Sequence, residues 1–340
     1  MLDDGFEAVL TGFQIADLDV ILDAAADTKS DHHDDDVIPA PGPAVTQCGD
    51  LWRLGTHRLL CGDALDGGCY NALLDGAKAS LIFTDPPYNV TIDGNAGGKG
   101  KVHHRTFAMG CGEMTTSGFT SFLTNTFQHL AANSLDGSIH YTCMDWRHMQ
   151  EMLAAGYAIY SELKNVCVWN KSNGGMGTFY RSKRELVFVW KSGTAPPQQF
   201  LGWPARTQSH QRLGLCWRQH VSFKAMDELQ MHPTVKPVAL VADAIKDCSK
   251  QGDNVLDPFC GSGTILIAAD RTGRKARALE IDPAYVDVAI RRWEELTGRS
   301  ATLSTGETFE EITEQRTVEP DIPQTEAVAP QTGGHYIGAL

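Results

Sequence analysis

A short polar signature follows an apolar run in the first third of the chain. Residues 84–89 read TDPPYN and come directly after SLIFT (80–84). Proline fixes φ and pushes the preceding residue into extended geometry, so this segment is stiff. The Asp85 carboxylate and the Pro86 carbonyl can then face one small donor. Two acceptors on the hydrogens of a ring amino group oppose delocalisation of its lone pair, so the nitrogen can attack a methyl group placed in line.

An aromatic residue, Tyr88, completes this signature. A nucleic-acid base must leave the duplex stack before an enzyme reaches its amino group, and an aromatic side chain replaces about 1–3 kcal/mol of lost stacking. The tetrapeptide DPPY (85–88) therefore predicts chemistry on the amino group of an extruded base. The same four residues are also compatible with a proline-rich turn capped by an aspartate.

A second signature, DPFCGSGT (257–264), lies between an apolar run and a helical pattern. Gly261 and Gly263 allow a tight turn and close approach of a ligand to the backbone. Glu280 ends the next apolar run, about twenty residues on, where an acidic residue suits ribose hydroxyls. The turn begins with Asp257 and lacks a phosphate-binding lysine, so it favours a ligand with an amino group and a ribose over a dinucleotide.

A third signature, MHPTVKPVAL (231–240), opens the helix that precedes the glycine turn. Pro237 is well placed for a first helical turn. Taken alone, these residues are most often capping and turn residues.

Apolar runs and amphipathic patterns alternate around the signatures, which is typical of an α/β fold with a mostly parallel sheet. Ligands bind such sheets at the carboxyl ends of the strands, where the first two signatures fall. The predicted strands are 80–84, 138–143, 165–169, 185–190, 254–257 and 276–282, and the predicted helices are 116–132, 145–155, 237–249, 263–272 and 283–297.

In this order, the three signatures resemble the beta group of DNA amino-methyltransferases, in which DPPY precedes an FxGxG-type turn. The resemblance covers about residues 50–300, including LWRLGTHRLLCGDA (51–64), residues 168–193 and ARALEIDPAYVDVAIRRWEELTG (276–298). It implies S-adenosyl-L-methionine as cofactor and double-stranded DNA as substrate. It also implies a Rossmann-like methyltransferase sheet, mostly parallel, with a reversed terminal hairpin. Because the group associates DPPY mainly with adenine-N6 and SPPY mainly with cytosine-N4, adenine is the expected base and cytosine the alternative.

The resemblance assigns roles residue by residue. Catalysis is expected of the tetrapeptide: Asp85, Pro86, Pro87 and Tyr88. The residues expected around the cofactor are Asp63, His232, Thr234, Lys236, Asp257, Phe259, Gly261, Ser262, Gly263, Thr264, Glu280 and Asp282.

Charge divides the chain into three parts. The net charge is −13, but residues 1–50 hold 12 acidic residues against Lys29, and residues 301–340 hold seven against Arg316. We interpret 1–47 as a largely disordered acidic linker or remnant without assigned activity, 48–302 as the methyltransferase domain and 303–340 as a disordered acidic tail. LTGFQIADLDVIL before the linker resembles the junction in proteins that carry a ParB-like nuclease domain before a methyltransferase.

The body between these ends suits a phosphate backbone, since residues 160–236 hold 11 Lys and Arg against four acidic residues. A small target-recognition insertion is predicted at 192–231, where basic and aromatic residues alternate, and a second basic loop at 89–114. The expected DNA contacts are Lys99, Lys101, Arg105, Arg206, Arg212, Arg218 and Lys224.

Other sequence features indicate the cellular location and the absence of a metal site. No apolar run approaches the ~20 residues that cross a bilayer, and no leader pattern is present. The nine cysteines form no C-x-x-C pair and no cluster with zinc spacing. These features predict a cytoplasmic protein with reduced thiols, no metal site and no membrane partner. A homodimer and a cognate restriction nuclease are compatible with the sequence, which specifies neither.

Three alternatives stay open at this point. Methylation of RNA or of a protein amide poses the same chemical problem, although those families usually place the glycine turn before the tetrapeptide. A cofactor-binding regulator would be favoured by an altered tetrapeptide, and DPPY is intact here. An oxidoreductase would leave DPPY unexplained.

Overall fold

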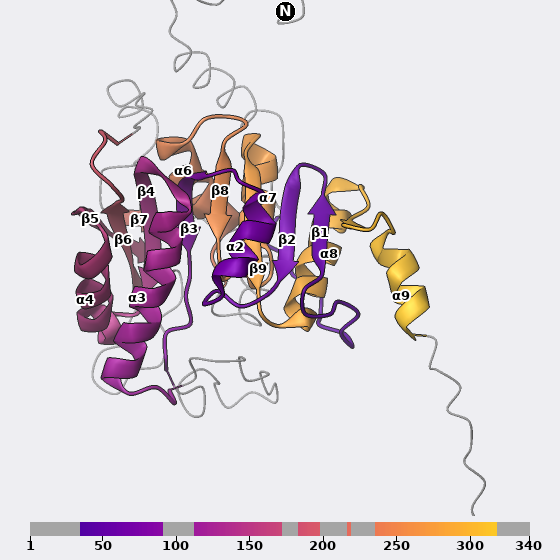
Figure 1. Cartoon of the computed structure of the whole chain (residues 1–340), viewed down its shortest axis with the longest axis horizontal. Coiled ribbons are helices and arrows are strands. Elements are labelled where there is room, and N and C mark those ends of the chain that lie inside the picture. Colours follow the sequence, from indigo (N-terminus) through magenta and orange to yellow (C-terminus); the bar gives the residue numbers. More distant parts are fainter. Residues whose placement is uncertain (1–34, 91–111, 172–182, 198–215, 219–234, 318–340) are drawn as a thin grey trace, which may run out of the picture.

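A computed structural model describes residues 35–90, 112–171, 183–197, 216–218 and 235–317 (Figure 1). These residues form one ten-stranded sheet with the order β10-β1-β2-β9-β8-β3-β4-β6-β5-β7. The strands are β1 (Leu51–Leu54), β2 (His57–Cys61), β3 (Ala79–Thr84), β4 (Ser134–Met144), β5 (Glu162–Asn170), β6 (Arg184–Lys191), β7 (Cys216–Arg218), β8 (Asn254–Asp257), β9 (Lys275–Glu280) and β10 (Thr302–Leu303).

The direction of the strands confirms the predicted fold class. Strands β2, β9, β8, β3 and β4 pair in parallel. Strand β6 then runs antiparallel between β4 and β5, which gives the predicted reversed hairpin. Strand β1 pairs antiparallel with β2 and β10 at the other end of the sheet. The five parallel strands therefore end at a single edge, and we call it the carboxyl edge.

Helices cover both faces of the sheet, and the alternation of strand residues explains why. Leu81 and Phe83 of β3 point into one buried cluster, whereas Ile82 points into the other. The first cluster contains residues of α6 (Val238–Cys248), α7 (Thr264–Thr272) and α8 (Pro283–Thr297). The second contains residues of α2 (Gly67–Leu74), α3 (Thr116–Ala132) and α4 (Met149–Ile159). The two layers can be followed in Figure 1.

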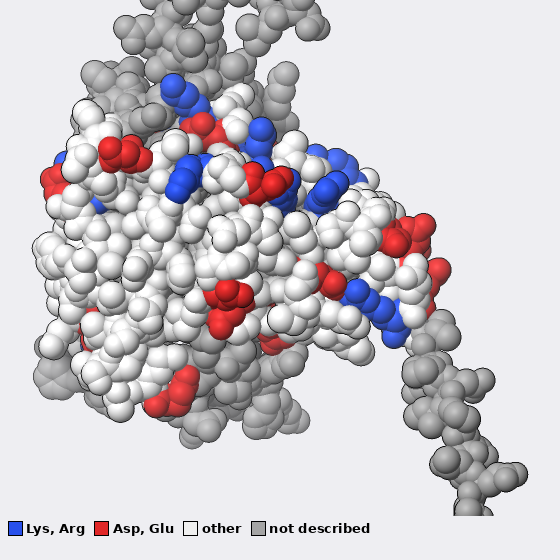
Figure 2. Space-filling view, in the orientation of Figure 1, with Lys and Arg blue, Asp and Glu red and all other residues white. Residues whose placement is uncertain are grey.

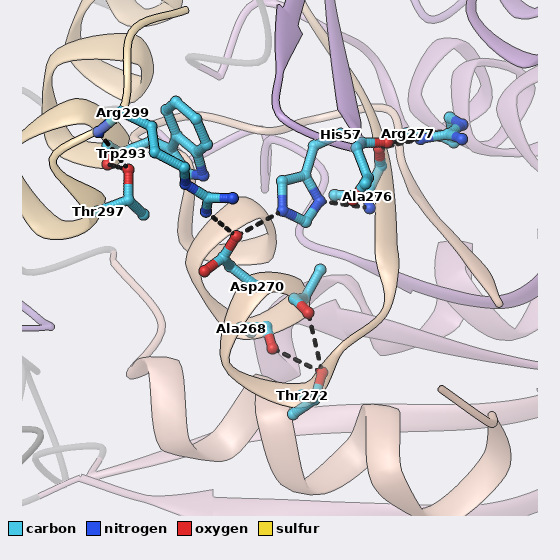
Figure 3. A network of polar contacts seen from close by, with 11 residues as sticks. His57, Ala268, Asp270, Thr272, Ala276, Arg277, Trp293, Thr297 and Arg299 are labelled. Carbon is cyan, nitrogen blue, oxygen red and sulfur yellow. Dashed lines mark hydrogen bonds and ion pairs between the residues drawn. The ribbon is translucent and has the colours of Figure 1, made fainter. Parts of the chain in front are cut away.

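A polar network fixes α7 to strands β2 and β9 (Figure 3). The Nδ1 atom of buried His57 accepts from Ala276 N at 3.0 Å, so Nε2 is the nitrogen that carries a proton toward Asp270 Oδ1, at 3.1 Å. Arg299 also contacts Asp270 and lies over the ring of Trp293. Burial opposes ionisation of Asp270, but His57 and Arg299 together lower its pKa to about 2. The helix that follows the glycine turn is thus held at its far end.

The N-terminal boundary of the folded body corrects the predicted linker. Asp35 pairs with Arg271 at 2.6 Å, and Asp36 Oδ1 accepts from Val238 N at 2.9 Å, at the start of α6. Further on, the carboxylate of Asp287 accepts from the backbone of residues 45 and 46. Residues 35–47 are therefore held on the body at 35–36 and at 45–46, and residues 40–44 between these contacts are exposed. The sequence pattern did not reveal these contacts, because the partners of Asp35 and Asp36 on α7 and α6 are far away in sequence.

The C-terminal tail needs the same correction at its start. Helix α9 (Phe309–Thr317) follows β10, and Phe309 and Ile312 are buried. Phe309 packs edge-on against Trp52, with 5.4 Å between ring centroids. Arg316 Nη1 pairs with Asp50 Oδ2 at 2.5 Å. Two apolar residues in a polar helix leave a weak periodic signal, which is why residues 303–317 were predicted to be disordered.

No helix within the described ranges is both long and apolar enough to span a bilayer.

Candidate active site

The two main signatures meet at the carboxyl edge because they follow neighbouring parallel strands. Strand β3 ends at Thr84, directly before Asp85, and β8 ends at Asp257. Thr84 Oγ1 donates to Asp257 Oδ1 at 2.9 Å. This buried hydrogen bond joins residues 173 apart in sequence, so the tetrapeptide and the glycine turn are parts of one site.

Both oxygens of the Asp85 carboxylate have close partners. The Tyr88 hydroxyl donates to Oδ1 at 2.5 Å, and the Lys236 ammonium donates to Oδ2 at 2.5 Å. Lys236 Nζ also lies 3.1 Å from the Tyr88 hydroxyl oxygen. The side chain of Lys236 is only 4% exposed. The three side chains form a compact, partly buried cluster in which the charge of Asp85 is balanced, and the Asp85 side chain is 26% exposed.

The structure places Lys236 at the tetrapeptide, whereas the resemblance implied a place near the cofactor. Its backbone nevertheless reaches the glycine turn, since its carbonyl accepts from Thr264 Oγ1 at 3.3 Å. The residue therefore spans the two halves of the site. The neighbouring His232 and Thr234 lie outside the described residues.

Sequence reasoning missed a second carboxylate in this cluster, Glu185 on β6. Its Oε1 lies 3.5 Å from Lys236 Nζ, and its Oε2 lies 3.0 Å from Lys171 Nζ at the end of β5. Strand β6 reaches the carboxyl edge because it pairs antiparallel with β4. A signal existed in the sequence, since a glutamate opens the otherwise apolar run ELVFVW. Glutamate is rarely buried without a partner.

The two glycines of the turn serve different purposes. Gly261 has a φ of +52°, and a Cβ atom there would meet nothing within 4 Å. Gly263 has a φ of +85°, and its Cβ would lie 2.8 Å from the Cβ of Ala289 on α8. Gly263 is therefore required for packing of the turn on the helix. Gly261 faces open space, which leaves its backbone accessible to a ligand.

The carboxylate of Glu280 borders that open space. Its Oε2 accepts from Gly261 N at 2.8 Å and its Oε1 from Asp282 N at 2.9 Å. Burial raises its pKa above the ordinary value. Asp63 is brought to the same place, because Gly62 N donates to the Glu280 carbonyl at 2.9 Å. These acceptors suit hydroxyl groups of a ribose.

The remaining turn residues are held by the protein itself. Phe259 N donates to Asp257 Oδ1 at 3.0 Å, and its ring lies 5.8 Å from that of Phe122. Buried Arg292 donates to the Ser262 carbonyl at 3.0 Å. Asp282 caps α8 by accepting from Ala284 N, so its carboxylate has a structural role. Most of these predicted cofactor residues therefore surround one turn, and the residues present fit a ligand with a ribose and an amino group.

The predicted DNA contacts remain predictions. Lys99, Lys101, Arg105, Arg206, Arg212 and Lys224 lie outside the described residues, and of Arg218 only its place in β7 is described. The target-recognition region 192–231 is described only at 192–197 and 216–218. On the face shown in Figure 2, the coloured Lys and Arg lie among Asp and Glu and form no separate basic patch over the described elements.

Comparison with known proteins identifies the family of the chain. Residues 79–291 match the DNA methylase family of N6 and N4 enzymes, and residues 1–48 match the ParB-methyltransferase HTH domain. The chain belongs to the N6/N4 DNA methylases. The predicted resemblance, including the ParB-type junction, is confirmed. Membership agrees with the predicted cofactor, S-adenosyl-L-methionine. For residues 1–48 the match supplies a description that the charge pattern did not, a helix-turn-helix domain.

Two curated relatives match part of this chain. The chain is 38% identical over 112 residues to DNA adenine methyltransferase YhdJ of Escherichia coli (strain K12), covering 33% of this chain and 34% of that protein. It is 30% identical over 132 residues to Type II methyltransferase M.Cfr9I of Citrobacter freundii, covering 38% and 44%. The matched segments thus span less than half the length of either relative.

Solved structures of similar fold include the M1.HpyAVI–SAM complex and the cytosine-N4-specific PvuII DNA methyltransferase. The former has a TM-score of 0.49 and 18% identity, covering 69% of this chain and 97% of that chain. The latter has a TM-score of 0.48 and 15% identity, covering 71% and 89%.

The first prediction concerns Glu280. We expect Glu280→Gln to weaken S-adenosylmethionine binding about 5- to 100-fold, because one acceptor of a buried site is lost. Glu294→Gln is the matched control, since Glu294 also accepts from a backbone amide, that of Ala301, but on the far part of α8. Calorimetric titration of both variants measures the effect. Equal affinity in the two variants would remove Glu280 from the cofactor site.

The second prediction follows from the pKa of Asp257, which burial raises to about 7. Below that pH the group is mostly protonated and neutral, and above it the carboxylate attracts an ammonium group. We therefore expect cofactor affinity to rise between pH 6 and pH 8 by up to about tenfold. Binding isotherms over this range test it, with Asp257→Asn expected to remove the dependence. A flat profile in the unsubstituted protein would show that Asp257 does not face the ligand's amino group.

Proposed function

We propose that the protein is a site-specific DNA methyltransferase that transfers the methyl group of S-adenosyl-L-methionine to the N6 amino group of adenine in double-stranded DNA. One observation carries the proposal. The Asp85 carboxylate, held by Tyr88 and Lys236, is joined through Thr84 and Asp257 to a turn whose Gly261 faces open space beside Glu280. These contacts support adjacent sites for substrate and cofactor at the carboxyl edge of the sheet.

The chain's own residues divide the work as follows. When bound, S-adenosyl-L-methionine supplies an electrophilic methyl group. Asp85 accepts a hydrogen bond from the amino group and so localises the lone pair on nitrogen. The ring of Tyr88 stacks on the extruded base. The proton that the nitrogen loses after transfer has Asp85 as its nearest acceptor.

Adenine is supported by the tetrapeptide and by one relative. This chain has Asp85 where enzymes that act on cytosine-N4 mainly have serine. The relative that is 38% identical over 112 residues is named a DNA adenine methyltransferase. Cytosine-N4 is the second candidate, because the family comprises both kinds of enzyme.

The test is nucleoside analysis. The full chain is incubated with unmethylated double-stranded DNA and labelled cofactor, and the digested DNA is analysed by mass spectrometry. We expect 6-methyladenine, with RNA and protein substrates unlabelled in parallel reactions. 4-Methylcytosine without 6-methyladenine would overturn the adenine assignment, and label only in RNA or protein would overturn DNA as the substrate.

A further inference from the structure

The buried ammonium of Lys236 has two carboxylates within reach, half-buried Asp85 and buried Glu185. Asp85 Oδ2 lies 2.5 Å from Nζ, and Glu185 Oε1 lies 3.5 Å from it. Lys171 pairs with the other oxygen of Glu185 at 3.0 Å. Four charges of alternating sign are therefore in contact one after another, in the order Asp85, Lys236, Glu185 and Lys171. The side chains of Lys236 and Glu185 are 4% and 7% exposed.

This arrangement conflicts with the chemistry required of Asp85. Tyr88 and Lys236 already occupy the two oxygens of the carboxylate. An amino group that enters the site has to share or displace one of these partners. Moving a buried ammonium away from its counterion is costly unless another counterion receives it. Glu185 is placed to be that second counterion.

Two aromatic rings border the space through which the Lys236 ammonium would move from Asp85 to Glu185. The Lys236 ammonium lies 5.4 Å from the ring centroid of Tyr88 and 5.5 Å from that of Trp169. Aromatic faces stabilise a cation at such distances without fixing its position. A shift of the ammonium from one carboxylate toward the other therefore keeps it between two favourable surfaces.

We propose that Glu185 is a positioning residue, which takes over the Lys236 ammonium when the amino group of the substrate base engages Asp85. The inference rests on the proposed function, because it assumes that Asp85 accepts from a substrate amino group. No covalent bond changes in this step. A counterion is exchanged, and the net charge of the cluster stays the same.

The exchange also prepares Asp85 to take up a proton. Burial is the main cause that raises the pKa of Asp85, Lys236 opposes it, and Glu185 adds to it. Burial acts on Glu185 as well, but Lys236 and Lys171 together hold its pKa below the ordinary value. Glu185 thus stays ionised. When the Lys236 ammonium moves away from Asp85, the pKa of Asp85 rises and the carboxylate becomes a stronger base. The charged or titratable groups around Asp85 are Lys236, Glu185, Tyr88, Cys143 on β4 and Asp257 on β8.

The test is the pH dependence of the single-turnover rate of methyl transfer, which avoids any limit set by product release. In Glu185→Gln, Asp85 is the remaining carboxylate partner of Lys236 among the described residues. We expect the rate to fall about tenfold or more. The acid limb of the profile should move to lower pH by at least about 0.5 unit, because the tightened pair lowers the pKa of Asp85. Cofactor affinity should stay close to that of the unsubstituted chain.

A second variant, Lys171→Gln, should shift the acid limb of the pH profile in the opposite direction. In Lys171→Gln, Lys236 is the remaining cationic partner of Glu185 within the part of the chain that the structure describes, which draws the ammonium away from Asp85. The acid limb should then move to higher pH by a similar amount. A merely structural role for Glu185 gives no reason for opposite shifts. Glu185→Asp, which keeps the charge, should recover part of the rate lost in Glu185→Gln.

The control is Glu162→Gln on neighbouring β5, where an exposed carboxylate pairs with Lys164 at 2.9 Å. Its rate and profile should equal those of the unsubstituted chain. Unchanged profiles in Glu185→Gln and Lys171→Gln, or shifts of the same sign, would overturn the proposal, and if Glu185→Gln fails to fold, the Lys171→Gln shift decides. Counting label on any base of DNA keeps this test separate from the adenine assignment, which a 4-methylcytosine product would overturn by itself.

Discussion

Replacement of Asp85 by alanine is expected to lower the rate of methyl transfer by about 10²- to 10³-fold, the usual loss when one charge-stabilising group is removed from an active site. The dissociation constant of the cofactor should remain nearly the same. The reason lies in the contacts, since the carboxylate interacts with Tyr88 and Lys236, and the open side of Gly261 is bordered by Glu280. Lys236 retains Glu185 as counterion in the variant, so the cluster should keep its fold.

The measurement combines calorimetric cofactor titration with single-turnover methylation of DNA. Glu162→Ala is a suitable control, because Glu162 is an exposed carboxylate at the start of β5, at the opposite edge of the sheet, where it pairs with Lys164 at 2.9 Å. Its cofactor affinity and transfer rate should match those of the unsubstituted chain. If Asp85→Ala lost cofactor affinity in proportion to its activity, Asp85 would belong to the cofactor site and the proposed division of roles would be wrong.

Removal of residues 303–340 should destabilise the body, because α9 is part of it. The deletion takes away buried Phe309 and Ile312 and the ion pair between Arg316 and Asp50. Loss of a buried Phe side chain alone costs about 3–5 kcal/mol. For a domain of this size that corresponds to a fall in Tm of roughly 6–20 °C.

The matched comparison is removal of residues 318–340, which takes away none of the contacts described for α9. Thermal unfolding of the two shortened chains and the full chain measures the difference. We expect the shorter deletion to leave Tm close to that of the full chain. Equal Tm values for both deletions would mean that α9 contributes little to stability.

Sequence patterns predicted the buried elements well and the edges poorly. The predicted helices 116–132 and 283–297 coincide with α3 and α8, because each has a continuous apolar stripe and a capping residue at its start. Strands β1 and β2 were not predicted as strands, since each is short and carries an arginine, Arg53 or Arg58. The helix predicted at 145–155 begins later, at Met149, because Trp146–His148 form a 3₁₀ turn.

The candidate site was also predicted only in part from the sequence. The tetrapeptide was identified as a group, and so was the glycine turn, because the residues within each signature are neighbours in sequence. The link between Lys236 and Glu185 was not, since these residues come from segments about fifty residues apart and meet only because β6 pairs with β4. Two-residue contacts across a sheet depend on topology, which local periodicity does not encode.

The order of the signatures along the chain has a consequence for folding kinetics. Strand β3, which precedes Asp85, pairs with β8, and the hydrogen bond between Thr84 and Asp257 spans 173 residues. At a synthesis rate of about 5–20 residues per second, roughly 9–35 s separate the appearance of the two partners on the ribosome. Throughout that interval one edge of β3 has no partner strand, and contacts of such high sequence separation form slowly. A nascent chain that stops before residue 254 carries the tetrapeptide but has no active site.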